Sequence, residues 1–224
     1  MNRRRIIIVD DHPLFRAALR QTLAGGDPAV AVEEAGDLAG LNDALEADRD
    51  CDLVLLDLNV PGARGFSGLL LLRAQYPDVP VMIISAVEEP DVVRSAMDLG
   101  AAGYLHKSVG PQEIRRAIET VLGGGIFVPE IGATAVEDPE QSALMRRLTT
   151  LTPQQVRVLM MLSDGLMNKQ IAYELTISEA TVKAHVSAIL QKLDVDSRTQ
   201  AVIAASRIEK GQFDTLLSTG RAPA

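Results

Sequence analysis

Short, unbroken apolar runs alternate with stretches of helical periodicity through the first half of the chain. Ile6–Val9, Leu53–Leu56 and Val81–Ile84 are continuous apolar runs, a pattern typical of strands buried on both faces of a parallel sheet. Two shorter strands are predicted around Val30–Val32 and over Gly103–Leu105. Each run is short enough to be one strand of a small domain.

A helical segment is predicted to follow each of these strands. The evidence is apolar residues at helical spacing, proline near the first position and glycine after the last. The predicted helices run from Pro13 to Gly25, from Asp37 through Leu45, over Leu69–Gln75, over Asp91–Leu99 and from Pro111 to Gly123. Repeated strand–helix units predict an α/β fold built on a doubly wound, parallel, five-stranded sheet.

The last third of the chain shows helical periodicity only. Thr152-Pro153-Gln154-Gln155 is a capping box with proline at the first helical position. Asn168 is predicted to cap a short second helix, and Ser178 a third, with Thr176-Ile177 as the turn between them. The third helix carries an apolar stripe that consists of Val182, Val186, Ile189, Leu190 and Leu193. A short helix, a tight turn and a capped third helix predict a helix-turn-helix unit.

The segment between these two regions has the composition of a linker. From Pro129 to Pro139 the residues are mainly Pro, Gly, Ala, Thr, Glu and Asp without periodicity. Ser142–Leu148 is predicted to be a short helix with Arg146-Arg147 exposed. We therefore predict an α/β domain over residues 1–128, a linker over 129–147 and an all-helical domain over 148–224. A second capping box at Ser197–Gln200 opens its last helix, which is predicted to run to Lys210.

Charge is distributed unevenly between these parts. The whole chain has a formal net charge of −8. Residues 1–141 carry 12 Lys and Arg against 23 Asp and Glu, a balance of −11, whereas residues 142–224 carry 10 against 7, a balance of +3. Any nucleic acid is therefore expected to bind the second part. Because +3 is a modest balance, one copy should bind weakly, and a dimer is expected.

Composition also excludes several other classes of protein. Cys51 is the only cysteine, so no intramolecular disulfide forms and a cysteine-based zinc site is excluded. A buried thiol beside a strand is the expected role. Arg3-Arg4-Arg5 resembles the start of an export signal, but the apolar run after it ends at two aspartates. No stretch has membrane-spanning length, so we expect a cytoplasmic protein without a membrane partner.

Reactive side chains follow four of the predicted strands. Asp10 and Asp11 follow the first strand, Asp57 and Ser85 end two others, and Lys107 follows the last. Because the carboxyl ends of parallel strands meet at one edge, these groups should form one crevice. Carboxylates that repel one another favour a hard divalent cation such as Mg²⁺. Asp57 is the expected nucleophile for a phosphoryl group, with Lys107 and Ser85 contacting the phosphoryl oxygens. The alternative is a purely structural carboxylate cluster.

The outer face of the predicted third helix suits DNA. It carries Thr181, Lys183, Ala184, Ser187 and Gln191, which are small or hydrogen-bonding. Lys183 is predicted to reach a guanine or a phosphate, and the Ala184 methyl suits a thymine methyl. Lys169, Ser178 and Thr181 are better placed for phosphates. The alternative is an ordinary helical bundle with a solvated face.

Four motifs of the first part together resemble the receiver domain of two-component response regulators, over roughly Ile6 to Val128. They are the acidic pair Asp10-Asp11, the turn Asp57–Gly62, Ser85-Ala86 and Lys107. The resemblance implies a flavodoxin-like fold and phosphorylation of Asp57 by a sensor histidine kinase. It also implies that Mg²⁺ binds Asp10, Asp11, Asp57 and the backbone carbonyl of Asn59. Ser85 and Tyr104 would form a switch pair, the Tyr104 ring moving inward. Ser108 departs from the pattern, because many receivers have proline there.

The segment from Leu151 to Ala204 resembles the LuxR-type helix-turn-helix of the NarL/LuxR response regulators. The matching motifs are Leu151-Thr152-Pro153, Asn168–Ala172, Ser178–Val186, Gln191-Lys192-Leu193 and Arg198–Ala201. Gln155 stands where the family usually has glutamate. His185 lies beside the DNA face, as a structural or phosphate contact. The family also implies dimerisation through the last helix, for which we expect Gln200, Ala201, Ala204, Ala205 and Ile208.

These resemblances predict a transcription factor that phosphorylation activates, and not an enzyme. The phosphorylated form is expected to be a homodimer that binds double-stranded promoter DNA with an inverted repeat, and RNA polymerase is a further candidate partner. A phosphohydrolase of the haloacid-dehalogenase class would need a second aspartate where Asn59 stands. A dinucleotide oxidoreductase would need a Gly-x-Gly-x-x-Gly motif after the first strand. A third alternative is a receiver that only mediates dimerisation; the complete acidic set argues against it.

Overall fold

A parallel sheet forms the centre of the first domain. The computed structural model describes residues 4–24, 30–130 and 138–209, and its sheet has five strands in the order β2-β1-β3-β4-β5, every pair of neighbours parallel. The strands are β1 (Arg4–Val9), β2 (Val30–Ala35), β3 (Leu53–Asp57), β4 (Val81–Ser85) and β5 (Gly103–His106). This confirms the predicted doubly wound sheet; the strand around Val30 is longer than predicted.

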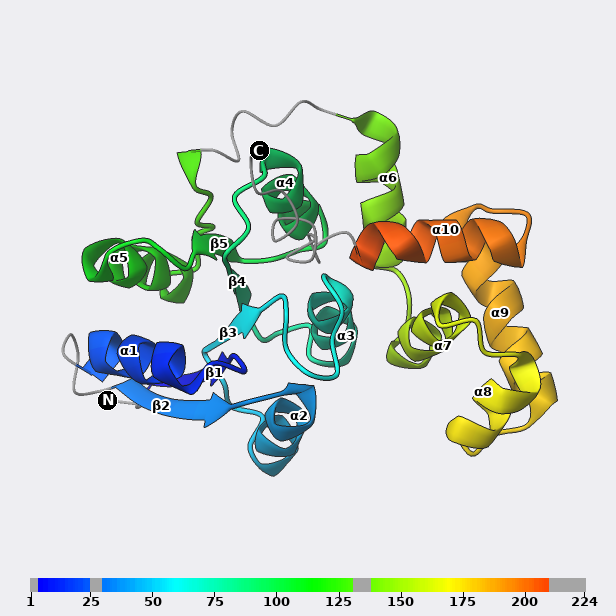
Figure 1. The fold of residues 1–224 in the computed structure, drawn as a ribbon, viewed down its shortest axis with the longest axis horizontal. Helices are drawn as coiled ribbons and strands as arrows, with labels where there is room; N and C mark the ends of the chain where they lie inside the picture. Colours follow the sequence, from blue (N-terminus) through cyan, green and yellow to red (C-terminus); the bar gives the residue numbers. More distant parts are fainter. Residues whose placement is uncertain (1–3, 25–29, 131–137, 210–224) are drawn as a thin grey trace, which may run out of the picture.

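Helices cover both faces of this sheet (Figure 1). They are α1 (Pro13–Ala24), α2 (Leu38–Ala47), α3 (Ser67–Gln75), α4 (Pro90–Asp98) and α5 (Pro111–Leu122). Side chains alternate between two cores, because successive strand residues point to opposite faces. Ile6 and Ile8 pack with residues of α1 and α5, whereas Ile7 and Val9 pack with residues of α2, α3 and α4.

The second domain is entirely helical within the described residues. Its helices are α7 (Pro153–Ser163), α8 (Asn168–Glu174), α9 (Glu179–Leu193) and α10 (Arg198–Glu209), preceded by α6 (Pro139–Leu148). The capping box at Thr152 and Gln155 is confirmed, and Ser178 caps α9 by accepting from the Thr181 N–H. The predicted all-helical fold after the α/β domain is therefore confirmed. Lys210 lies outside the described residues.

Two predicted caps differ from the structure. Met167 is the residue before α8, so the predicted cap Asn168 is its first helical residue; the Asn168 Oδ1 accepts a hydrogen bond from Arg198 instead, at 3.0 Å. Ser197 Oγ accepts from the Gln200 N–H at 3.2 Å, but the Gln200 side chain accepts from the Asp196 N–H. Only the Ser197 half of that predicted capping box forms, because the Gln200 side-chain oxygen accepts from the N–H of Asp196 and not from that of Ser197.

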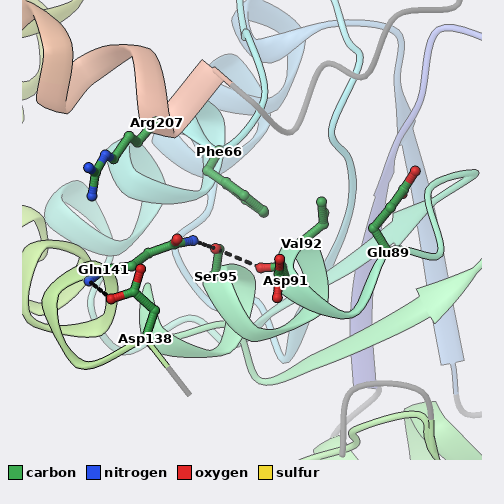
Figure 2. Close-up of a pocket in the computed structure, with 8 residues that line it drawn as sticks. All are labelled: Phe66, Glu89, Asp91, Val92, Ser95, Asp138, Gln141 and Arg207. Atoms are coloured by element: carbon green, nitrogen blue, oxygen red, sulfur yellow. Dashed lines mark hydrogen bonds between the residues drawn. The ribbon is translucent and has the colours of Figure 1, made fainter. Parts of the chain in front are cut away.

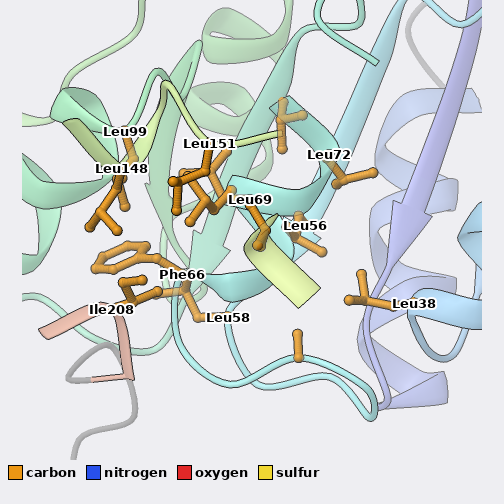
Figure 3. Close-up of a cluster of buried hydrophobic side chains, with 14 of the residues drawn as sticks. Leu38, Leu56, Leu58, Phe66, Leu69, Leu72, Leu99, Leu148, Leu151 and Ile208 are labelled. Atoms are coloured by element: carbon orange, nitrogen blue, oxygen red, sulfur yellow. The ribbon is translucent and has the colours of Figure 1, made fainter. Parts of the chain in front are cut away.

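The two domains share one buried core (Figure 3). Phe66 and Leu69 of the first domain lie in the same apolar cluster as Leu148, Leu151 and Ile208. The predicted linker contributes to it, since residues 139–147 are the body of α6 and its Met145 side chain is buried. Residues 131–137 of that linker lie outside the described part. The second domain is thus docked on the α3 and α4 side of the sheet.

Hydrogen bonds flank this apolar contact. Ser142 of α6 donates to Asp98 at the end of α4 at 2.7 Å. The side-chain amide of Gln141 donates to Ser95 of α4 at 3.1 Å. These two bonds hold α6 along α4. They lie beside a cavity of about 330 Å³ between the domains, lined by Phe66, Glu89, Asp91, Val92, Ser95, Asp138, Gln141 and Arg207 (Figure 2).

Cys51 is buried next to β3, as expected, and burial raises the pKa of its thiol to about 11. Among the described helices, none combines the length and apolarity that crossing a membrane requires.

Candidate functional site

Three charged side chains meet at the carboxyl edge of the sheet. Asp57 ends β3 and Asp10 follows β1; both are almost completely buried, at 3% and 2% exposure. Lys107, which follows β5, places its Nζ 2.8 Å from Asp57 Oδ2 and 2.7 Å from Asp10 Oδ2. The strand order brings the ends of β1 and β3 together and β5 two strands away. The sheet thus assembles the predicted crevice from residues far apart in the sequence.

Burial and the contacts between charged groups shift the pKa values of the crevice in opposite directions. Burial raises the pKa of the Asp57 carboxyl, although the hydrogen bond from Lys107 acts in the opposite direction. For Lys107, burial lowers the pKa, but the ion pair with Asp10 and the hydrogen bond to Asp57 outweigh this, so the net shift is upward. Two buried carboxylates share one ammonium group, which leaves them incompletely neutralised. Additional positive charge would therefore bind favourably here.

The donor atoms of the crevice fit a divalent cation. One ligand atom from each of Asp10, Asp11, Asp57 and His12 lies within 4.8 Å of the others, as ligands of a single ion would. Asp10 Oδ2 is close to Lys107 but has no hydrogen-bond partner of good geometry among the described residues. Carboxylate oxygens suit Mg²⁺, so the predicted Asp10, Asp11 and Asp57 fit this metal. Asn59, whose carbonyl is the fourth predicted ligand, is exposed beside them.

His12 is a neighbour that the sequence did not lead us to predict. Its Nδ1 lies 2.6 Å from Asp11 Oδ1 and 3.2 Å from Asp10 Oδ1. The available signal was its position directly after the acidic pair. In the structure the exposed His12 ring contacts one carboxylate oxygen of Asp10 and one of Asp11 from the solvent side of the crevice.

Asp11→Ala is expected to weaken Mg²⁺ binding by roughly tenfold or more, since loss of even an outer-shell partner of a metal typically costs that much. Isothermal titration with Mg²⁺ measures this. Asp43→Ala is a matched control, because Asp43 is an exposed carboxylate of α2 away from the crevice. Equal affinities for Mg²⁺ in the two variants would contradict the assignment of Asp11.

Ser85 and Tyr104 lie beside the crevice as a hydrogen-bonded group. Ser85 is fully buried, and its Oγ accepts from the Val87 N–H at 3.2 Å. Tyr104 OH donates to the Val87 carbonyl at 2.7 Å, and the ring is 1% exposed. Burial raises the pKa of the Tyr104 hydroxyl to about 12. The ring therefore occupies the inner position already, and the predicted inward movement is not required from this conformation.

The predicted DNA face of α9 is open to solvent. Six of the seven predicted DNA contacts are exposed and His185 is half-buried; the exposed ones are Lys169, Ser178, Thr181, Lys183, Ala184 and Ser187. Lys183 pairs with Glu179 one turn earlier, at 3.3 Å. The hydroxyls of Ser178 and Thr181 lie 2.8 Å apart within the helix cap. The exposure of these side chains shows that the first domain leaves the outer face of α9 uncovered in this structure.

The predicted pairing residues of α10 lie mostly inside the chain. Ala201, Ala204, Ala205 and Ile208 are buried against the other helices, whereas Gln200 is exposed. Ile203, which was not predicted, is 55% exposed and presents the apolar part of the outer face. A partner that meets α10 in this conformation would contact Gln200 and Ile203. The alanines and Ile208 would be available only after α10 separates from its neighbours.

Family comparisons match both parts of the chain. Residues 6–119 match the model described as "Response regulator receiver domain", and residues 149–205 match "Bacterial regulatory proteins, luxR family". The chain is 41% identical to the "Glycerol metabolism activator" of Pseudomonas putida over 92% of its length and 96% of the relative's. It is 38% identical to "Nitrate/nitrite response regulator protein NarP" of Escherichia coli over 88% and 92% of the two lengths.

Solved structures show the same fold. A LuxR family DNA-binding response regulator from Silicibacter pomeroyi is 35% identical, with a TM-score of 0.51 over 57% of this chain and 98% of that one. The response regulator RcsB in an RcsB–DNA complex is 22% identical, with a TM-score of 0.55 over 92% of this chain and 98% of that one.

Proposed function

The chain belongs to the response regulators that join a receiver domain to a LuxR-type DNA-binding domain, and we propose that it takes a phosphoryl group on Asp57 and thereby controls promoter binding. The family is one of transcriptional regulators and not of enzymes. The observation that carries the proposal is the buried Asp57–Lys107–Asp10 cluster on the same chain as an exposed helix-turn-helix face. Since its target is promoter DNA, we place the protein in the cytoplasm.

Phosphoryl transfer needs a nucleophile, charge neutralisation and a donor. An Asp57 Oδ attacks the phosphorus of a phosphohistidine on a sensor kinase; the P–N bond breaks and the imidazole leaves with the bond's electron pair. Lys107, already 2.8 Å from Asp57, supplies positive charge to the phosphoryl oxygens. Mg²⁺ held by Asp10, Asp11, Asp57 and the Asn59 carbonyl would neutralise further charge there. The Ser85 hydroxyl donates to a phosphoryl oxygen.

The segment after Asp57 connects the crevice to the second domain. It runs from Leu58 to Phe66, between β3 and α3. The Phe66 N–H donates to the Ile208 carbonyl of α10 at 3.0 Å, and Arg64 pairs with Asp164 directly after α7. Phosphorylation adds close to two negative charges at the start of this segment. We propose that the segment shifts in response and releases the end of α10.

Release of α10 would then permit pairing. Because the α9 face is exposed already, control is exerted on dimerisation and not on access to DNA. A two-fold pair contacts an inverted repeat with half-sites about one helical turn apart. Two modestly basic domains together bind more phosphates than one, so the homodimer is the form that binds promoters tightly.

Lys183→Ala is expected to weaken DNA binding. Loss of a base contact would cost roughly 1–3 kcal/mol and relax the preference at one base position. Loss of a phosphate contact would instead weaken binding evenly across sequences and lower the salt dependence. Fluorescence anisotropy with varied DNA and salt distinguishes these results. Arg157→Ala is the matched control, since Arg157 is an exposed basic residue of α7, which precedes the helix-turn-helix of α8 and α9; equal effects would argue against a specific role for Lys183.

Selection of bound sequences from random DNA tests the whole proposal. It is run with and without acetyl phosphate and Mg²⁺. Enrichment of an inverted repeat only in the phosphorylated sample is expected. An identical set of sequences and affinities in both samples would contradict phosphorylation control and would favour a receiver that only mediates dimerisation.

A further inference from the structure

His106 at the end of β5 joins that strand to the loop after β4. Its Nε2 lies 2.9 Å from the Ala86 carbonyl oxygen. Its Nδ1 lies 2.9 Å from Glu88 Oε1 and 2.5 Å from Ser108 Oγ. Because a carbonyl oxygen only accepts, Nε2 carries a proton and donates to Ala86. The imidazole is thus a donor aimed at the residue next to Ser85.

The loop has few other fixed contacts. Ala86, Glu88 and Glu89 are exposed, so Val87, which is half-buried and packs against the core, is the one residue of this stretch with apolar packing. Two side chains of β5 hold it by hydrogen bonds: Tyr104 OH to the Val87 carbonyl and His106 to the Ala86 carbonyl. These two residues are two positions apart and so project from the same face of the strand. They contact successive carbonyls of the loop.

Ser85 depends on this loop for its orientation. Ser85 and His106 are register partners in the β4–β5 pair, and the Ser85 carbonyl accepts from the Lys107 N–H at 2.8 Å. The Ser85 Oγ accepts from the Val87 N–H. A shift of residues 86–88 would therefore turn the hydroxyl that donates to the phosphoryl group. Among the described residues, the side-chain hydrogen bonds and ion pairs of His106 go to Ala86, Glu88 and Ser108 and not to Asp10, Asp11 or Asp57.

We propose that His106 is a positioning residue, which holds the β4–α4 loop through Ala86 so that the Ser85 hydroxyl stays directed at the phosphoryl site. The proposal rests on the function proposed above and adds a residue to it. In the sequence, His106 is only the residue before Lys107, and its role follows from the side-chain contacts in the fold.

The test measures how tightly full-length protein with Mg²⁺ binds beryllium trifluoride, a tetrahedral mimic of the phosphoryl group. His106→Leu keeps a side chain of similar size and removes the donor, so affinity is expected to fall by roughly fivefold, the effect of one typical hydrogen bond. His106→Gln restores a donor, the side-chain amide, and should recover most of the affinity. Glu88→Ala leaves the bond to Ala86 intact and should change affinity less than about twofold. Affinity for Mg²⁺ alone should be unchanged in all three.

Several results would overturn the role of His106. Wild-type affinity in His106→Leu would show that the donor is not needed. Equal losses in His106→Gln and His106→Leu would show that shape matters and the hydrogen bond does not. A parallel loss of Mg²⁺ affinity would indicate general damage to the crevice. Failure of the wild-type protein itself to bind the mimic would instead overturn the phosphoryl site, which separates the two proposals.

Discussion

Asp57→Asn is expected to abolish incorporation of phosphate from acetyl phosphate or a kinase, with the fold intact. The amide has nearly the same shape as the carboxyl but is not a nucleophile. Acid-labile phosphate measured by radiolabel or intact mass should fall to background. Circular dichroism should be unchanged, and undiminished phosphate on the variant would remove Asp57 from the mechanism.

The same substitution should alter how stability depends on pH. Burial raises the folded-state pKa of Asp57, so this carboxyl stabilises the folded protein at acidic pH, and that contribution is lost as pH rises through the raised pKa. In the absence of Mg²⁺, wild-type protein should therefore lose more thermal stability than Asp57→Asn between about pH 4 and about pH 7, a range above the ordinary Asp pKa of about 3.9. Asp43→Asn, an exposed carboxylate, is the control.

Gly65→Ala is expected to separate the two domains without phosphorylation. A Cβ at Gly65 would clash with the Ile208 carbonyl oxygen, and the residue has a φ of +54°. A backbone oxygen of α10 must therefore move away. We expect a larger radius in small-angle scattering, faster amide exchange at Phe66, and DNA affinity of the unphosphorylated protein raised by roughly tenfold, a typical coupling between sites.

Gly124→Ala is the matched control for the backbone strain that alanine introduces at a glycine with positive φ. Gly124 also has a positive φ, +82°, but nothing lies within 4 Å of the position of its Cβ. Both variants incur about 1–2 kcal/mol for a left-handed non-glycine residue, whereas only Gly65→Ala disturbs α10. If both variants keep the wild-type scattering profile and still need phosphorylation to bind DNA tightly, the segment between β3 and α3 does not hold the domains together.

Much of the architecture could be predicted from local patterns. The apolar runs at 6–9, 53–56 and 81–84 could be buried only as central strands, and both Asp57 and Lys107 sit directly at strand ends. Parallel strands bring their carboxyl ends to one edge, so the meeting of these two residues follows from the alternation of strands and helices. The helix caps at Thr152 and Ser178 are similarly local, since each needs only backbone N–H groups within three residues.

Two features depended on tertiary contacts: how the two domains dock, and where the side chains beside Ser85 lie. Nothing in the local pattern of α10 distinguishes Ile208, buried against Phe66, from the exposed Ile203, because both are apolar positions of one helix. The inner position of Tyr104 and the reach of His106 to Ala86 likewise depend on where the β4–α4 loop lies beside β5. Periodicity along the chain determines which face of an element is apolar; packing between distant elements determines which part of that face remains free to bind a partner.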